Sequence, residues 1–217
     1  IPEKGIKNLN DDCEVYMTSH SEPFSSELAS ILSNEKREIN TLYIGAGSLG
    51  SKMIMHDARI GKSSIGAVDN DNLFSNRIGK NKAEEIIDEI KSFYELDTTE
   101  KLIAYNNLIS ELNDVIINKY DLLVDTTASQ LVLQNLIQKE LKSNTLYAKC
   151  ELVDNGQVGL LYIEGNERNP RMDDLVNYAC YLATTNSELE NWRRADALRE
   201  PDTLNIGLGC NSITTVM

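Results

Sequence analysis

Three closely spaced glycines, Gly45, Gly47 and Gly50, have the spacing that holds the phosphates of a nucleotide. Gly45 and Gly47 permit a tight turn and a close approach of backbone to phosphate, and Gly50 removes a side chain where a helix meets a strand. The predicted helix begins near Ser48, so its free amides and the positive end of its dipole would face the anion. Nineteen residues after Gly50, an apolar run ends at Asp69, where an acid can accept hydrogen bonds from ribose hydroxyls. Together these residues predict a nucleotide-binding α/β domain.

The elements that must position these residues alternate between strand and helix along the chain. Short apolar runs predict parallel strands, and apolar residues at helical spacing predict the helices between them. After residue 141 the pattern changes to two strands joined by a turn at residues 154–156. The predicted fold is α/β: a Rossmann-like doubly wound, mostly parallel sheet extended by an antiparallel hairpin. The predicted strands are 41–44, 65–68, 102–105, 120–124, 146–153 and 158–163, and the predicted helices are 48–60, a segment from about 83, 129–141 and 173–199.

The periodicity also predicts which side chains face the core. Sheet-facing residues are expected on each helix, and Cys150 and Cys180 are expected to be packed rather than reactive. His56 is expected to be solvated or packed. The predicted buried residues are Met53, Ile54 and Ala58, then Ile86, Ile87, Ile90, Phe93 and Tyr94, then Leu131, Leu133, Leu136 and Ile137. The glycine-rich tail 206–212 is expected to be a loop.

Composition narrows the classes of partner. A net charge of −13 argues against nucleic acid and acidic membranes as partners. Since no apolar run is long enough to span a bilayer and no secretory leader is visible, we expect a cytoplasmic protein without membrane attachment. The four cysteines are scattered and form no C-x-x-C pair, so neither a zinc ribbon nor a disulfide framework is expected. The chain begins with Ile1, so we expect a piece of a longer protein, with residues 1–23 as a linker or arm.

The order of the motifs resembles the ThiF/MoeB superfamily, the adenylation domains of ubiquitin-activating enzymes. The resemblance covers about residues 40–163. It suggests that residues 24–217 form one adenylation domain. Residues 169–175 and 209–214 look like the bacterial ThiF-like activating enzymes of CBASS-type anti-phage operons. The matching motifs are the glycine turn, Asp69-Asn70-Asp71, Ser75-Asn76-Arg77, Gly79-Lys80-Asn81-Lys82-Ala83 and Asp125-Thr126-Thr127.

The resemblance implies an ATP-dependent enzyme that adenylates the C-terminal carboxylate of a ubiquitin-like or other protein. Arg77 and Lys82 would then clamp the phosphates as fixed cations. Asp69 would hold the ribose with Asp71 close behind it, and Asn76 would bind the nucleotide or order its loop. A conjugating domain elsewhere in a longer chain, and a homodimer, are also implied.

Two further roles follow from the resemblance and are less direct. Cys210 would receive the acyl group as a thioester, since a glycine-flanked thiol is accessible to attack; a packed cysteine is an equal alternative. The family's magnesium-binding Asp is Ala128 here, so Asp125 or Asp71 would have to hold Mg²⁺.

Three alternatives to this activity remain open at this point. The first is adenylation without a thioester. The second is a regulatory partner that keeps the fold without catalysis, which Ala128 and a shortened loop after Arg77 favour. The third is an NAD-dependent oxidoreductase, which shares the glycine turn but has no use for the Asn-Arg and Lys-Ala motifs. For Arg77 and Lys82 themselves, the alternative is a solvated charge cluster at the start of a helix.

Overall fold

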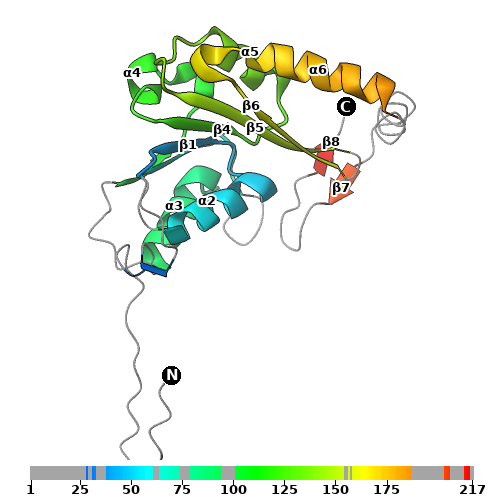
Figure 1. Cartoon of the computed structure of the whole chain (residues 1–217). Coiled ribbons are helices and arrows are strands. Elements are labelled where there is room, and N and C mark those ends of the chain that lie inside the picture. The colour runs from blue at the N-terminus through cyan, green and yellow to red at the C-terminus, as the bar shows by residue number, and fades with distance from the viewer. Residues whose placement is uncertain are drawn as a thin grey trace, which may run out of the picture.

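A six-stranded sheet in the order β3-β2-β1-β4-β5-β6 forms the centre of the computed structural model. The structure describes residues 28, 31–32, 38–60, 64–73, 79–93, 101–153, 156, 158–186, 203–205 and 213–215. Figure 1 shows α2 and α3 on one face of this sheet and α4, α5 and α6 on the other. Among the described residues, no helix is both long and apolar enough to cross a membrane.

The first five strands of the sheet are parallel, and the last pair is antiparallel. The strands are β1 (Thr41–Ile44), β2 (Ile65–Val68), β3 (Leu102–Tyr105), β4 (Leu122–Asp125), β5 (Leu146–Val153) and β6 (Val158–Ile163). The chain crosses from β1 to β2 and β3 on one side, then returns to β4 on the other side of β1. The predicted fold class, a doubly wound parallel sheet extended by an antiparallel hairpin, is therefore confirmed.

The connecting helices follow the predicted order, except that a short helix at 114–117 was not predicted and the last helix ends at residue 185 rather than near 199. They are α2 (Ser48–Ile60), α3 (Lys82–Phe93), α4 (Asp114–Ile117), α5 (Gln130–Gln138) and α6 (Met172–Thr185), with 3-10 turns η2 (Ile109–Glu111) and η3 (Asn166–Arg168). A separate pair of short antiparallel strands, β7 (Thr203–Asn205) and β8 (Ile213–Thr215), was not predicted. The expected loop at 206–212 lies between them, outside the described residues.

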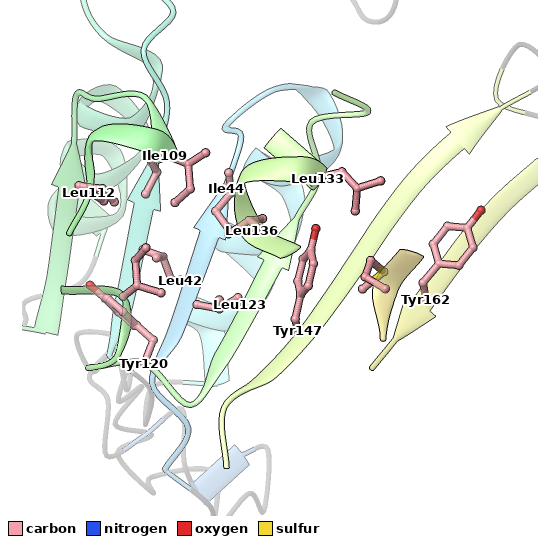
Figure 2. Packing of buried hydrophobic residues seen from close by; sticks show 13 residues of the cluster. Leu42, Ile44, Ile109, Leu112, Tyr120, Leu123, Leu133, Leu136, Tyr147 and Tyr162 are labelled. Atoms are coloured by element: carbon pink, nitrogen blue, oxygen red, sulfur yellow. The ribbon is translucent and has the colours of Figure 1, made fainter. Parts of the chain in front are cut away.

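Each face of the sheet has its own hydrophobic core, because successive strand residues point to opposite faces. On one face, Tyr43, Ala67 and Val124 pack against the isoleucines and alanines of α2 and α3. On the other, Leu42, Ile44 and Leu123 pack against η2, α4, α5 and α6; Figure 2 shows part of this cluster. Burial on both faces is what a parallel sheet covered by helices requires.

Several predicted burials are wrong or only partly right: Met53 and Ile137 are half-buried, and Tyr94 lies outside the described residues. Leu131 is 69% exposed, because it lies two residues before buried Leu133 and so on nearly the opposite side of α5. Cys180 is exposed, since α6 packs through the stripe that includes Met172, Ala179 and Ala183. Phe93, the last residue of α3, is 63% exposed. Cys150 is half-buried against the α2/α3 cluster.

Candidate functional site

The glycine turn follows β1 and opens α2, as the sequence predicts. Gly45 has a φ of +93°, a conformation that side chains rarely adopt, and its amide donates to the Val68 carbonyl at 2.8 Å. A Cβ on Gly50 would lie 2.0 Å from the Gly45 carbonyl oxygen, so the helix can approach the strand only without a side chain there. A Cβ on Gly47 would meet nothing within 4 Å. The turn is therefore packed at Gly45 and Gly50 and open at Gly47.

Asp69 holds this turn from the end of β2. One carboxylate oxygen accepts from the Ala46 amide at 2.7 Å, and the other accepts from the Asp71 amide at 2.8 Å. A carboxylate can accept about four hydrogen bonds, so two acceptor positions remain for ribose hydroxyls. Asp69 thus orders the turn in addition to its predicted role toward ribose.

Thr126 fixes the turn from the other side. Its hydroxyl donates to the Gly45 carbonyl at 2.9 Å, and its amide donates to the Ile44 carbonyl at 2.9 Å. In the register of the sheet, Ile44 lies between Val68 and Asp125, so three strand ends meet beside the turn. Because the strand order reverses between β1 and β4, this is the topological switch point at which α/β sheets bind ligands.

Asn81 is a site residue that the sequence analysis missed. It is 2% exposed, and its side-chain amide donates to the Asp69 carbonyl at 2.7 Å, the Asp71 carbonyl at 3.2 Å and the Asn106 side-chain oxygen at 3.0 Å. Its own side-chain oxygen accepts from the amides of Ala83 and Glu84, which caps α3. The available signal was an asparagine directly before an amphipathic helix, a typical N-cap.

Lys82 is a cation connected to the glycine turn through Asp71 and Asp69. Its ammonium lies 2.9 Å from a carboxylate oxygen of Asp71, and its side chain is 15% exposed. A cation in the first turn of α3 faces the positive end of the helix dipole, which is unfavourable and is offset here by Asp71. The structure therefore brings together Lys82, Asp71, Asp69 and the glycine turn through consecutive contacts.

Asp125 does not fit the predicted role of metal ligand. It is fully buried, and one oxygen accepts from the amide and hydroxyl of Thr127 at 2.9 and 2.7 Å. The other accepts from the Tyr147 hydroxyl at 3.2 Å and lies 3.7 Å from the Lys149 ammonium. Mg²⁺ needs several oxygen ligands around it, whereas both Asp125 oxygens are already engaged by the residues named above. We therefore assign no metal to Asp125.

Ala128 has a φ of +44°, in the left-handed region that alanine rarely adopts. Asparagine and aspartate tolerate this region better than alanine. The backbone at this position would therefore suit asparagine or aspartate better than the alanine that is present.

Three predicted site residues, Asn76, Arg77 and Cys210, lie outside the described residues, so their predicted roles stay predictions. The His56 side chain, predicted to be solvated or packed, is exposed on α2.

Comparison with known proteins finds similarity only among solved structures. No family model and no curated protein matches the sequence. The structure of E. coli MccB with succinimide matches 58% of this chain and 41% of its own at 18% identity, with a TM-score of 0.43. E. coli MccB with MccA gives 19% identity and a TM-score of 0.42, and its complex with AMPCPP and MccA gives 19% and 0.40. These two matches cover 54% of this chain and 37% of MccB.

The chain therefore spans less than half the length of these MccB structures. A likeness at this level establishes neither the family nor the activity of the chain.

Proposed function

We propose that this chain binds ATP at the glycine turn and adenylates the C-terminal carboxylate of a peptide or protein. The observation that carries the proposal is the connected arrangement at the switch point: an open Gly47, a helix N-terminus, Asp69 and Lys82. The amides and dipole of α2 favour an anion. Asp69 offers acceptors to ribose, and the Lys82 ammonium, next to Asp71, supplies a fixed positive charge for the phosphates.

The reaction needs charge stabilisation more than acid–base catalysis. A carboxylate oxygen of the substrate attacks the α-phosphorus of ATP, the bond from that phosphorus to the bridging oxygen breaks, and pyrophosphate leaves. Lys82 would stabilise the negative charge that accumulates on the phosphate oxygens, and we propose Arg77 as a second cation with the same role. Asn76 is proposed to order the loop between them or to bind the nucleotide.

We further propose that the acyl group passes to Cys210. Its thiolate would attack the acyl carbon of the adenylate, AMP would leave, and a thioester would form. The sequence motifs favour membership of the ThiF/MoeB superfamily, a ubiquitin-like substrate, a homodimer and an anti-phage role. Each of these is a proposal that rests on the resemblance.

A second candidate is a regulatory partner that binds nucleotide without turning it over. Two observations favour it: Asp125 is engaged by Thr127, Tyr147 and Lys149, and Ala128 provides no carboxylate where the resembling family has one.

ATP–pyrophosphate exchange separates these candidates. We would measure exchange with peptides that end in a free carboxylate, with the same peptides amidated as controls. Exchange that requires the free carboxylate and disappears in Asp69→Ala supports adenylation. ATP binding without exchange supports the regulatory partner. Loss of a thiol-labile acyl adduct in Cys210→Ala, with exchange retained, would support the thioester.

A further inference from the structure

Among the described residues, Lys149 is a buried lysine, and neither core packing nor the proposed reaction explains its position. The Lys149 side chain on β5 is 2% exposed, and its ammonium lies 3.7 Å from an Asp125 oxygen and 3.1 Å from a Glu151 oxygen. Although the second separation is that of an ion pair, the ammonium meets no acceptor at hydrogen-bonding geometry among the described residues. A buried ammonium without hydrogen bonds is costly, so its positive charge requires carboxylates close by.

Glu151, the nearer carboxylate, has a side chain that is 16% exposed; the fully buried neighbour of Lys149 is Asp125. The two residues face each other across adjacent parallel strands, because Asp125 pairs with Lys149 in the register of β4 and β5. Tyr147, two residues earlier on β5, donates its hydroxyl to the same carboxylate at 3.2 Å. Figure 2 shows Tyr147 within the cluster on this face of the sheet. Lys149 and Tyr147 together occupy the side of Asp125 that faces β5.

On its other side, Asp125 is connected to the glycine turn by contacts of the segment that follows β4. Its first oxygen accepts from the amide and hydroxyl of Thr127, which fixes the backbone directly after β4. Thr126, in that same segment, donates to the Gly45 carbonyl at 2.9 Å. In addition, a Cβ on Gly45 would lie 2.8 Å from the Thr127 methyl carbon. A continuous set of contacts therefore runs from Lys149 through Asp125 and its two threonines to the turn.

We propose that Lys149 is a positioning residue for the nucleotide turn, with its ammonium in the place beside Asp125 that a divalent cation would otherwise need. In this arrangement Asp125 is held in its orientation toward Thr127, and it contributes no ligand to a metal. This proposal takes from the proposed function only the assumption that the turn binds ATP. The positional effect on the turn itself does not depend on any ligand.

The test uses Lys149→Met, which removes the charge and keeps most of the side-chain volume. The double variant Asp125→Asn/Lys149→Met removes both charges, while the Asn oxygen can still accept from Thr127. Lys139→Met is the matched control, because the Lys139 ammonium also forms an ion pair, at 3.2 Å with Asp114, and donates to the Leu112 carbonyl rather than toward the turn. Amide hydrogen exchange of residues 45–48 is measured on the whole chain without ligand.

Lys149→Met is expected to accelerate exchange at residues 45–48 by about tenfold or more, because it leaves a buried unpaired carboxylate. The double variant is expected to return exchange to within about threefold of wild type, and Lys139→Met to leave it unchanged. If Lys149→Met does not fold, Lys149→Gln carries the same expectation. Unchanged exchange at 45–48 in the single variant would overturn the proposal, as would equal acceleration in the control.

ATP binding with and without Mg²⁺ supplies the second measurement. If Asp125 ligates no metal, the double variant keeps the Mg²⁺ dependence of the wild-type dissociation constant; loss of that dependence would overturn the proposal. Absence of ATP binding in the wild type would refute the proposed function, while the exchange measurement would still decide the role of Lys149.

Discussion

Gly47→Ala is expected to weaken nucleotide binding without loss of stability, whereas Gly50→Ala is expected to lose stability, although the two glycines lie three residues apart. At Gly50, a Cβ would lie 2.0 Å from the Gly45 carbonyl oxygen and 2.6 Å from the Thr126 hydroxyl, so backbone must move. Overpacking of this kind costs roughly 1–3 kcal/mol. The better helix propensity of alanine offsets at most about 1 kcal/mol. Because the obstacle is backbone, we expect a net loss of about 2 kcal/mol.

At Gly47 the added methyl group has no neighbour within 4 Å, so folding is unaffected or slightly favoured. The smaller entropy of the unfolded chain would add about 0.4–1 kcal/mol to stability. The same methyl would stand in the open part of the turn where a phosphate approaches the amides. We expect at least about a tenfold higher dissociation constant for ATP, equivalent to about 1.4 kcal/mol.

Urea unfolding gives the stability of each variant, and calorimetric titration gives its affinity for ATP. Gly50→Ala should lower the unfolding midpoint, whereas Gly47→Ala should keep or slightly raise the midpoint and lose affinity. Wild-type affinity in Gly47→Ala would contradict our placement of the phosphates. Equal destabilisation by both variants would contradict the division of the turn into a packed and an open part.

Three further predictions concern the residues around the turn. Lys82→Met should weaken ATP binding by about tenfold or more with little change in stability, since its partner Asp71 is 61% exposed; an unchanged affinity on titration would exclude a phosphate contact. Asn81→Ala should lower the free energy of unfolding by about 2–4 kcal/mol, because α3 loses its cap and two backbone carbonyls lose a donor. Urea unfolding that gives a free energy within about 0.5 kcal/mol of wild type, roughly the spread of neutral surface changes, would refute this. Cys180 should react with iodoacetamide well before Cys150 at pH 8, as burial and the Asp125 charge raise the pKa of the Cys150 thiol; peptide mapping that finds Cys150 modified first would contradict that order.

Hydrophobic periodicity, together with the spacing of the glycines and the turn residues at 154–156, was sufficient to predict the parallel sheet, the glycine turn and the antiparallel hairpin. The bounds of α2, β1, β2, β3, β5 and β6 agree with the pattern, because each element has a strong apolar face and a clear turn signal. Gly156, in the predicted hairpin turn, has a φ of +79°, which glycine adopts readily.

What the pattern could not predict depends on contacts between distant residues. Asp125 was predicted to bind a metal because the resemblance places Ala128 where the family has its magnesium-binding Asp, but Lys149 lies on the next strand and pairs with Asp125 across 24 positions of sequence. Asn81 joins three segments through one side-chain amide, and its composition signal is no stronger than that of the neighbouring asparagines. The exposed positions of Leu131 and Cys180 follow from which stripe of a helix meets the sheet, and this becomes fixed only in the fold.

The glycine turn is proposed to bind ATP in preference to a dinucleotide. Calorimetric titration of the whole protein with ATP and, separately, with NAD tests it most directly, with Lys82→Met as the comparison. We expect saturable ATP binding that weakens in Lys82→Met, together with weak or no NAD binding. Tight NAD binding that is unaffected by Lys82→Met, with no binding of ATP, would contradict it.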